Sequence, residues 1–429
     1  MKKNFNIAVI GLGQIGSYLL NELNIKKKDI YKKTGKKINV IAISAKNKNK
    51  KRKFKINKSI FYKDPIDLIN KKKIDILFEA IGLSDGISKK VVENALKNKI
   101  HVITPNKALI SKHGDYLSKI AENKKVNLEF EASVGGGIPI LRTLKEGLST
   151  NVITKVYGIL NGTCNYILSE MDKTNDNFKN VLKKAQKLGY AEPGDPKLDI
   201  NGYDTLAKVR ILSSLAFKKK ISKNNLLMEG IENIEPKDFK IANQLNLKIK
   251  LLGITEIINN SLFERVHPCL VQKDTYIGNV NGVMNAVIVN GKPVGESVLQ
   301  GEGAGPGATS SALMSDLLSI LRGNIKYSFG IPDSKRKKVV PYNGKNSSNS
   351  LYFRFEVKDK PGVLSEITKL LANNKISIER VIQIPNHKLK SASIIIITHK
   401  AIENRSQNLI NSLKRNNNII KKPVQIRLF

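Results

Sequence analysis

The chain has 429 residues, enough for roughly two to four domains, and its 41% hydrophobic content is ordinary for a globular protein. Lys and Arg number 74 against 36 Asp and Glu, which gives a net charge of +38. The excess is mostly lysine spread over the whole chain, so it indicates a compositional bias and not one basic face. The charge favours anionic ligands, but without a recognisable nucleic-acid-binding motif we expect no specific nucleic-acid partner.

Cysteine spacing and hydropathy argue against further classes of protein. Cys164 and Cys269 lie far apart without a CxxC pair, so neither a disulfide framework nor a zinc site is expected. No apolar run reaches about 18 residues, so no membrane span is expected. Residues 1–16 contain no small-residue cleavage site and pass straight into a glycine-rich motif, which is typical of a first strand and not of a signal peptide. We therefore expect a cytoplasmic protein.

A dinucleotide-binding motif follows the first predicted strand. Residues 6–10 form a short apolar run, residues 11–16 have the sequence GLGQIG, and a helix-like segment follows. GxGxxG alone often marks only a glycine-rich turn, but strand, motif and helix in this order predict nucleotide binding. Gly11 permits a tight turn, Gly13 lets the backbone approach a pyrophosphate, and Gly16 allows the helix to pack closely on the strand. The first N–H groups of the helix would then face the phosphates.

The end of the second predicted strand, residues 38–43, bears on cofactor choice. In NAD-preferring sites an Asp or Glu at this point binds the ribose 2′-hydroxyl group, and none is present here. The residues that follow would suit a 2′-phosphate, although lysine is abundant everywhere: Ser44, Lys46, Lys48, Lys50, Lys51 and Arg52. We therefore predict that NADP(H) is preferred and that NAD(H) is possible.

Alternating strands and helices complete this first domain. The predicted elements are strands at 74–81, 101–104 and 128–132 and a helix at 91–97. The alternation predicts a doubly wound α/β domain of Rossmann type. Because ligands bind at the carboxyl ends of such strands, Ile81 and residues 104–107 should lie near the nicotinamide.

An acidic, turn-rich stretch interrupts the lysine-rich chain. Its charged residues are Glu192, Asp195, Asp199 and Asp204, followed by Lys208. Asp204 and Lys208 are spaced i, i+4 and share one face of a predicted helix. A lysine positioned next to carboxylates can donate a proton in a polar substrate site. A solvated ion pair on a surface helix explains the same spacing, and the stretch alone leaves both interpretations open.

Two glycine-rich loops lie in the middle region. SVGGGIP at 133–139 demands an unusual backbone, and GEGAGPG at 301–307 indicates either phosphate approach or a domain hinge. Asn161 to Thr163 is predicted to form a tight turn. The other predicted elements of this region are helices at 140–147, 178–188 and 308–321 and strands at 152–160 and 286–289.

The last part of the chain has a different pattern. Residues 333–350 are polar, basic and turn-rich, which is typical of an interdomain linker. From residue 351 onward the predicted order is βαββαβ, a ferredoxin-like unit. Its predicted strands are 351–357, 376–384, 391–398 and 424–428, and its predicted helices are 361–372 and 407–413.

Several motifs, in this order, resemble the homoserine dehydrogenase family in the form that carries a C-terminal ACT domain. They are GLGQIG (11–16), TPNKAL (104–109), FEASVGGGIP (130–139), GILNGTCNYIL (158–168), LGYAEPGDPKLDINGYDTLAK (188–208), NVNGVMNAV (279–287), GEGAGPGATSSAL (301–313) and, for the ACT domain, DKPGVLSEI (359–367). The resemblance covers nearly the whole chain. It implies a Rossmann domain at 1–130 completed by a returning segment near 305–325, an α+β catalytic and dimerisation domain at 131–304, and an ACT domain at 351–429.

The resemblance implies a reaction, the NAD(P)H-dependent interconversion of L-aspartate 4-semialdehyde and L-homoserine, on the way to threonine, isoleucine and methionine. Lys208 would donate the proton to the aldehyde oxygen, with Lys107 as its partner near the nicotinamide. Glu192 and Asp204 would hold the substrate ammonium group, and Asp199 would help to set Lys208. The chemistry agrees, because hydride delivery develops negative charge on the aldehyde oxygen and a nearby ammonium group stabilises it.

Binding positions also follow from the resemblance. A monovalent cation, usually Na⁺, would be held largely by backbone carbonyl groups at Glu131, Val134, Gly136 and Ile138. Cofactor contacts would come from Gly11, Gly13, Gln14, Ile15, Gly16, Ser44, Ile81, Thr104, Lys107 and Gly303. The chain departs from the family pattern at three positions: Gly194 adds a residue between Glu192 and Asp199, Cys164 replaces a usual Thr, and Glu302 replaces a frequent Arg.

The ACT-like tail implies regulation and assembly. Amino acids would bind near residues 359–364, and we predict feedback inhibition by threonine; the alternative is a dimerisation module without an effector. A homodimer or homotetramer is expected from the resemblance alone. Two other functions are a related Rossmann enzyme, such as an aspartate dehydrogenase, and a regulator that senses NADPH or binds nucleic acid. Neither accounts for the acidic stretch before Lys208.

Overall fold

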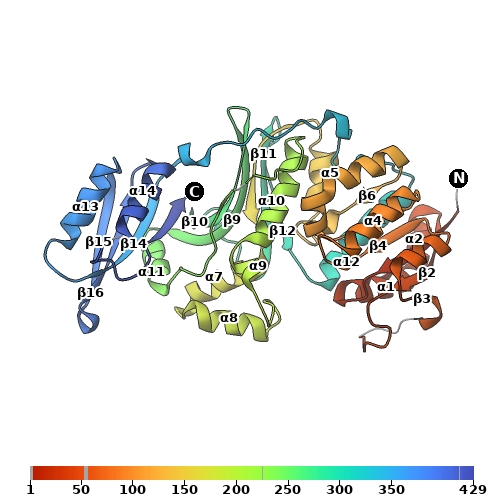
Figure 1. The fold of residues 1–429 in the computed structure, drawn as a ribbon, viewed down its shortest axis with the longest axis horizontal. Coiled ribbons are helices and arrows are strands. Elements are labelled where there is room, and N and C mark those ends of the chain that lie inside the picture. The colour runs from red at the N-terminus through yellow and green to blue at the C-terminus, as the bar shows by residue number, and fades with distance from the viewer. Residues whose placement is uncertain (1–2, 53–56, 225, 415) are drawn as a thin grey trace.

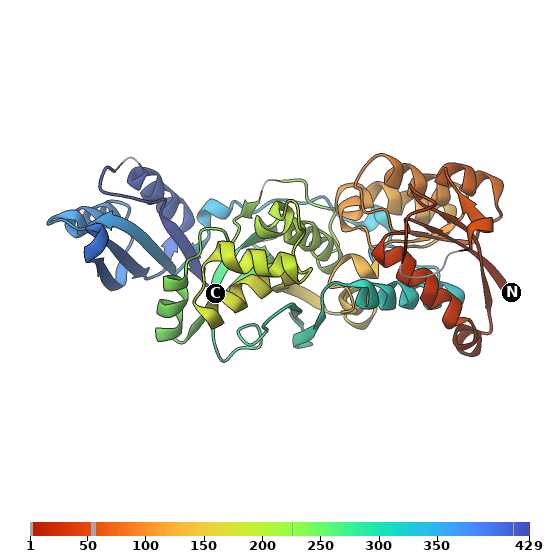
Figure 2. The same cartoon turned by 90° about the horizontal axis from the view of Figure 1, so that it is seen from below.

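The computed structural model describes residues 3–52, 57–224, 226–414 and 416–429. Three domains follow one another along an elongated molecule, with the N-terminal domain at one end and the C-terminal domain at the other (Figure 1). Figure 2 shows the same row from below, with α12 (Pro306–Leu321) beside α1 (Gln14–Ile25). The chain therefore returns to its first domain before it enters the last one.

A six-stranded parallel sheet in the order β3-β2-β1-β4-β5-β6 forms the N-terminal domain. Its strands are β1 (Asn4–Ile10), β2 (Lys37–Ser44), β3 (Phe61–Tyr62), β4 (Ile76–Glu79), β5 (His101–Ile103) and β6 (Leu128–Glu129), and its helices, besides α1 and α12, are α2 (Lys27–Thr34), α3 (Pro65–Lys71), α4 (Ile87–Lys97) and α5 (Lys107–Lys124). Ile7 and Val9 pack on one helical layer and Ala8 and Ile10 on the other, because a parallel sheet is buried on both faces. The predicted doubly wound class is confirmed.

The predicted strand at 128–132 is too long. The strand β6 ends at Glu129, and a 3₁₀ turn, η2 (Glu131–Ser133), follows. The backbone N–H of Glu131 donates to the Asp316 carboxylate at 3.0 Å and not to a neighbouring strand. Helix α12 thereby fixes the point at which the chain leaves the first domain.

The central domain is built on a sheet in the order β12-β11-β7-β9-β10. Its strands are β7 (Val152–Ile159), β9 (Leu247–Ile258), β10 (Ser261–Gln272), β11 (Met284–Lys292) and β12 (Gly295–Glu302), with β8 (Leu227–Met228) beside β10, and its main helices are α7 (Gly162–Thr174), α8 (Phe178–Lys187), α9 (Lys197–Ile200), α10 (Tyr203–Ala216) and α11 (Pro236–Gln244). Helix α10 lies close on β9 at Gly253, where a Cβ atom would sit 2.6 Å from Val209 and 2.9 Å from Thr205. Only glycine therefore lets α10 approach this sheet so closely.

Two features of the central domain differ from the sequence predictions. The tight turn predicted at 161–163 is wrong, because the Asn161 side chain accepts the backbone N–H of Cys164 at 2.8 Å and caps helix α7. The long hairpin of β9 and β10 was absent from the predictions. Its turn is Asn259-Asn260, and both residues have positive φ angles, 48° and 63°.

The C-terminal domain has the predicted ferredoxin-like order. It contains β14 (Leu351–Lys358), α13 (Val363–Asn373), β15 (Ile378–Asn386), β16 (Ser391–Thr398), α14 (Glu403–Leu413) and β18 (Val424–Leu428). Strands in the order β18-β14-β16-β15 form an antiparallel sheet. A short parallel pairing of Cys269 and Leu270 with Arg427 and Leu428 joins β10 to β18, so one sheet runs through both domains.

Residues 333–350, which the sequence predicts as a linker, lie against both earlier domains. The Arg336 guanidinium group is buried and bonds Asp115 of α5 at 2.6 Å. Leu262 of β10 exchanges backbone hydrogen bonds with Val340 and Tyr342 at 2.7 and 2.8 Å. The connection is therefore fixed along its length. Among the described residues, no helix combines the length and the apolar composition needed to cross a membrane.

Candidate active site

The glycine-rich loop between β1 and α1 has the geometry of a phosphate-binding turn. Gly11 has a φ of 90°, and a Cβ atom there would lie 2.4 Å from the carbonyl carbon of Ala80. A Cβ atom at Gly16 would lie 1.9 Å from the carbonyl oxygen of Gly11. A Cβ atom at Gly13, in contrast, would meet nothing within 4 Å. Gly11 and Gly16 thus close the turn, and Gly13 leaves room for a ligand. Gln14 and Ile15 begin helix α1, whose first N–H groups face that room.

The basic segment after β2 folds back over this loop. Arg52 donates to the carbonyl oxygens of Leu12, Asn47 and Lys50 at 3.1, 2.7 and 2.9 Å. Its guanidinium group therefore holds the segment against the glycine-rich loop. Ser44 is buried at the end of β2, and the lysines predicted to meet a 2′-phosphate are exposed: Lys46, Lys48, Lys50 and Lys51.

A buried carboxylate, Glu79, organises the carboxyl ends of β4 and β5. It accepts hydrogen bonds from the Thr104 hydroxyl at 2.6 Å and from the Ile81 backbone N–H at 2.9 Å. The Asn106 side chain also faces it at 3.4 Å and caps α5 by accepting the Leu109 N–H at 3.0 Å. Lys107 is the first residue of that helix, so this network fixes where Lys107 points.

Two lysines from different domains meet on one carboxylate. Asp204, at the start of α10, accepts Lys107 on one oxygen at 2.8 Å and Lys208 on the other at 2.7 Å. Lys208 also donates to the carbonyl oxygen of Leu160 at 2.5 Å. The Lys208 side chain is 9% exposed, whereas that of Lys107 is 42% exposed. The predicted i, i+4 pair is thus buried and joined to the nucleotide domain, and is not a solvated surface pair.

Asn161 ties the acidic residues together. Its side-chain amide donates to Asp199 at 2.8 Å and to Asp204 at 2.9 Å. The same side chain caps α7, so the cap and the cluster depend on one residue. The Cys164 thiol, at the position where Thr is usual, donates to the Asp199 carbonyl at 3.3 Å and packs without entering the cluster.

The electrostatics of the cluster follow from burial and these contacts. Burial alone would raise the pKa of Asp204, but the ammonium groups of Lys208 and Lys107 outweigh it and hold the pKa below its usual range. The Asp204 carboxylate in turn raises the pKa of Lys107. Burial and the neighbouring Asp204 carboxylate raise the pKa of Asp199. The site therefore holds two lysine side chains around one firmly ionised carboxylate.

A cavity of about 700 Å³ opens beside the cluster. Lys107, Glu192, Asp199 and Asp204 line it together with residues of α5 and α10. Glu192 is exposed, and its carboxylate makes no hydrogen bond or ion pair with any described residue. Its charge nonetheless contributes to the raised pKa of Lys107. The structure thus brings all the predicted catalytic and substrate residues to one place, with Glu192 at the rim.

The triple-glycine turn lies against the second glycine-rich loop. Gly135 and Gly136 have φ angles of 72° and 54°, and a Cβ atom at Gly136 would lie 2.6 Å from the carbonyl group of Gly303. Among the described residues, nothing donates a hydrogen bond to the carbonyl oxygens of Val134 and Gly136. The Ile138 carbonyl accepts the Ile140 N–H at 2.8 Å.

Glu131 adds a buried carboxylate to this turn. Its side chain accepts the Leu141 N–H at 2.9 Å, and burial raises its pKa despite Lys145 and Arg142 nearby. Oxygen donors of this kind suit a hard cation, and a bound cation would offset the cost of burying the charge. In the described part of the chain there is no cluster of His, Cys, Asp and Glu that could hold a metal by side chains alone.

Two residues of the site, Glu79 and Asn161, were not singled out from the sequence. For each of them, the sequence contains a feature that could have indicated its role. Glu79 is the one acidic residue near the end of the apolar segment ILFEAI, and a buried carboxylate needs partners. Asn161 precedes a helix, where Asn is a favoured cap, but the Asn-Gly pair also fits a turn.

The dinucleotide-binding fold, together with a lysine-carboxylate cavity at its edge, defines an NAD(P)-binding oxidoreductase. Family models agree with each part of the chain: "Homoserine dehydrogenase, NAD binding domain" matches residues 11–131, "Homoserine dehydrogenase" matches 139–318, and "ACT domain" matches 352–418. The chain belongs to the homoserine dehydrogenase family, whose enzymes act on a CH–OH group.

Individual relatives match along the whole chain. The chain is 36% identical over 434 residues to a homoserine dehydrogenase of Neisseria gonorrhoeae, covering 99% of both chains. It is 37% identical over 431 residues to that of Helicobacter pylori, covering 100% of both. A crystal structure of a homoserine dehydrogenase from Thiobacillus denitrificans is similar with a TM-score of 0.90 and 34% identity, over 100% of this chain and 99% of that one.

Proposed function

We propose that the chain interconverts L-aspartate 4-semialdehyde and L-homoserine with NADP(H) as the preferred cofactor, in the biosynthesis of threonine, isoleucine and methionine. The observation that carries the proposal is the Lys107–Asp204–Lys208 cluster beside a cavity at the edge of the nucleotide domain. Membership of the homoserine dehydrogenase family supports it. Bound NADP(H) supplies or accepts the hydride.

Lys208 is proposed to hold and move the proton at the substrate oxygen. Its ammonium group has three N–H donors, and two are directed to Leu160 and Asp204. The third is left for the aldehyde oxygen, where a fixed positive charge stabilises the alkoxide that forms. Lys107 uses one donor on Asp204 and is proposed to orient the same oxygen from the side of the nucleotide domain.

The substrate ammonium group needs a carboxylate that is still free. Asp204 has both oxygens engaged by lysines, so we assign it first to holding Lys107 and Lys208. Glu192 lines the cavity, and its carboxylate has no partner among the described residues. We therefore propose Glu192 as the main ammonium contact, with Asp199 and the charge of Asp204 behind it.

Cofactor and cation binding are proposed from the two glycine-rich turns and the end of β2. Gly11, Gly13, Gln14, Ile15 and Gly16 would hold the pyrophosphate, and Gly303, Ile81 and Thr104 would lie toward the nicotinamide. Ser44 and the exposed lysines would meet a 2′-phosphate. Na⁺ would be held by Glu131 and by the carbonyl groups of Val134, Gly136 and Ile138; the two carbonyls without hydrogen bonds support this.

Regulation and assembly are proposed through the ACT domain. A cavity of about 460 Å³ lies at the loop 357–364 and is also lined by Gln383 and Ile394. Its position agrees with the effector site expected near 359–364, so we propose threonine as a feedback inhibitor that binds there. Pairing of catalytic and ACT domains between chains would give a homodimer or homotetramer.

One assay tests the reaction. NADPH oxidation is measured with aspartate semialdehyde, with an unrelated aldehyde and with an imine as controls, and each reaction is repeated with NADH. The proposal expects turnover of the semialdehyde alone and a higher kcat/KM with NADPH. Turnover of the imine would instead support an amino-acid dehydrogenase. A higher kcat/KM with NADH would refute the cofactor preference.

A further inference from the structure

Helices α5 and α10 carry the lysines of the candidate active site from two different domains. The two helices pack against each other where the nucleotide domain meets the catalytic domain (Figure 1). Lys107 begins α5, and Asp204 and Lys208 lie in the first two turns of α10. Both helices also line the cavity beside these residues. The spacing of α5 and α10 therefore sets how far Lys107 stands from the Asp204 carboxylate.

Arg336, in the segment that leads to the ACT domain, joins the same two helices farther from the lysines. Its guanidinium group bonds the Asp115 carboxylate of α5 at 2.6 Å and the Ser214 hydroxyl oxygen of α10 at 2.5 Å. It also donates to the Lys219 carbonyl oxygen at 3.0 Å and lies 3.9 Å from the centre of the Phe329 ring. The Arg336 side chain is 1% exposed, so water has no access to replace these contacts.

Neighbouring contacts hold this segment on both domains. The Asp333 backbone N–H donates to Glu122 of α5 at 2.8 Å, and the Asp333 carboxylate accepts Lys220, which follows α10, at 2.5 Å. Gly114 of α5 makes the close approach possible, because a Cβ atom there would lie 2.9 Å from the Ile221 side chain. Arg336 is thus the centre of a joint between the nucleotide and catalytic domains.

A buried arginine gives this joint one defined geometry. Taking a guanidinium group out of water is costly, so a buried ion pair adds little net stability. Any arrangement in which the guanidinium group loses an acceptor is nevertheless penalised, because a buried donor is left unsatisfied. The acceptors on α5 and at the end of α10 must therefore keep their relative positions while Arg336 stays between them.

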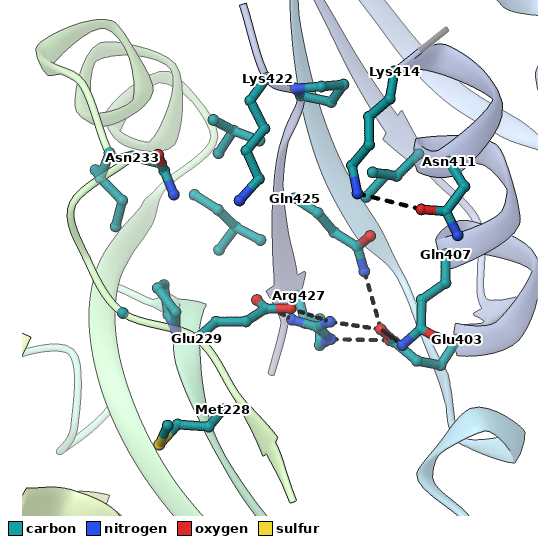
Figure 3. Close-up of a pocket in the computed structure, with 17 residues that line it drawn as sticks. Met228, Glu229, Asn233, Glu403, Gln407, Asn411, Lys414, Lys422, Gln425 and Arg427 are labelled. Carbon is teal, nitrogen blue, oxygen red and sulfur yellow. Dashed lines mark hydrogen bonds and ion pairs between the residues drawn. The ribbon is translucent and has the colours of Figure 1, made fainter. Parts of the chain in front are cut away.

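A second buried arginine joins a different pair of domains. Arg427 bonds Glu229 of the catalytic domain at 2.7 and 2.9 Å and Glu403 of the ACT domain at 3.0 and 2.6 Å (Figure 3). Its side chain is 3% exposed. Arg427 and Arg336 are thus similarly buried, but neither partner of Arg427 belongs to α5 or α10. Arg427 therefore provides a matched control for Arg336.

We propose that Arg336 is a positioning residue for the proposed reaction: by fixing the spacing of α5 and α10, it holds Lys107 and the nucleotide domain at the working distance from Lys208. Arg336 is not among the residues that line the active-site cavity, so it acts through the two helices. A misplacement of about 1 Å in a reaction site costs on the order of 10²-fold in rate. The segment 333–350 then takes part in catalysis besides connecting the ACT domain. This inference rests on the proposed function.

Kinetics of Arg336→Met and Arg427→Met test the positioning role. Each substitution removes a buried guanidinium group from a domain junction and keeps an unbranched side chain. In NADPH-dependent reduction of aspartate semialdehyde, kcat should fall about 10–100-fold in Arg336→Met and stay within about twofold in Arg427→Met. NADPH affinity should be unchanged in both, because the dinucleotide lies on the nucleotide domain. An equal fall in the two variants, or an unchanged kcat in Arg336→Met, would overturn the proposal.

Two further variants guard against a simple loss of folding. Arg336→Lys keeps a cation beside Asp115 and should recover part of the lost kcat. Ser214→Ala removes only the hydroxyl acceptor on α10 and replaces Arg336→Met in the comparison if that variant does not fold. The thermal unfolding midpoint of each variant serves as the folding control. A kcat in Arg336→Lys as low as that in Arg336→Met, at an unchanged midpoint, would contradict the role of the charge.

A distance measurement tests the same proposal without turnover. Both cysteines of the chain are buried, so nitroxide labels can be attached to Lys97→Cys in α4 and Lys183→Cys in α8, at two exposed positions. Pulsed EPR on labelled chains diluted with unlabelled chains should give the same distance distribution in the parent and in Arg427→Met, and a broader or shifted one in Arg336→Met. An unchanged distribution in Arg336→Met would overturn the proposal. If no chain reduces the semialdehyde, the proposed function fails, whereas this measurement still decides whether Arg336 sets the spacing of the domains.

Discussion

Two of the places where the molecule buries carboxylates with basic groups differ in the balance of charge. Where the ACT domain joins the catalytic domain, Arg427 is matched by two glutamates, and Arg354 by Asp238 at 2.7 Å and Glu356 at 3.0 Å. In the candidate active site, one carboxylate, Asp204, serves two lysines. The interface satisfies its donors with acids already present. The active site keeps unused lysine donors beside a cavity.

The difference indicates that the buried charges of the interface are structural, whereas those of the active site take part in chemistry. Saturated networks lock two domains in one arrangement, because removing either partner leaves an unpaired charge in a dry environment. An unsaturated network keeps donors for the negative charge that develops on the substrate during the reaction. Substitutions should therefore change activity at the active site and stability at the interface.

Among the carboxylate substitutions, the largest effect is expected from Asp204→Asn. Loss of the carboxylate frees both lysines and leaves their like charges close together, so kcat/KM for homoserine oxidation should fall on the order of 10²-fold or more. Asp67→Asn is the matched control, because Asp67 and Lys71 form an i, i+4 pair at 2.8 Å on an exposed surface. An equal loss in both variants, or no loss in Asp204→Asn, would show that the cluster has no catalytic part.

Asp238→Ala should act on stability. Asp238 is buried and accepts Tyr352 at 2.6 Å and Arg354 at 2.7 Å. Its removal takes the nearest carboxylate away from the buried Arg354 and leaves the Tyr352 hydroxyl group without its acceptor, which costs about 3–5 kcal/mol of unfolding free energy. Urea unfolding of the full chain measures the change. The surface variant Asp67→Asn should cost less than about 1 kcal/mol, and a similar loss in both would contradict the contrast.

Glu192→Gln should affect substrate binding with little effect on the chemical step. The expected change is a rise of about tenfold in KM for homoserine, because one charge-assisted contact to the ammonium group is weakened. Steady-state kinetics with saturating NADP⁺ measure it, and Asp195→Asn on the same loop is the control. An unchanged KM would remove Glu192 from the substrate site.

The smallest effect concerns acid stability at the interface. Burial would raise the pKa of Glu356 and of Glu235, but Lys237 and Arg354 outweigh it and lower both. A lowered folded pKa gives stability that is present above the unfolded value, about 4.3, and is lost as pH falls through the folded value. The urea midpoint should therefore hold from pH 7 to about 5 and decline below about 4.3. Glu356→Gln with Glu235→Gln should flatten that decline; an equally steep decline would contradict this origin.

The sequence predicted the structural features that depend on residues close together in the chain. The strand, glycine motif and helix at the N-terminus and the i, i+4 spacing of Asp204 and Lys208 are of this kind. The contact of Lys107 with Asp204 joins two domains, and no spacing encodes it; only the family resemblance placed both residues in one site. The hairpin turn at Asn259-Asn260 was missed because its positive φ angles fall on asparagine and not on glycine. The pairing of β10 with β18 involves only two residues on each strand and left no pattern to recognise.

The central claim is that Lys208 moves the proton in a reductase site, and its removal tests this most directly. Lys208→Ala is assayed for NADPH-dependent reduction of aspartate semialdehyde, with NADPH affinity measured in parallel by fluorescence titration and Lys71→Ala as the control. The expected result is a fall in kcat of about 10²–10⁴-fold with unchanged NADPH affinity. A kcat within a few-fold of the unsubstituted chain would contradict the claim.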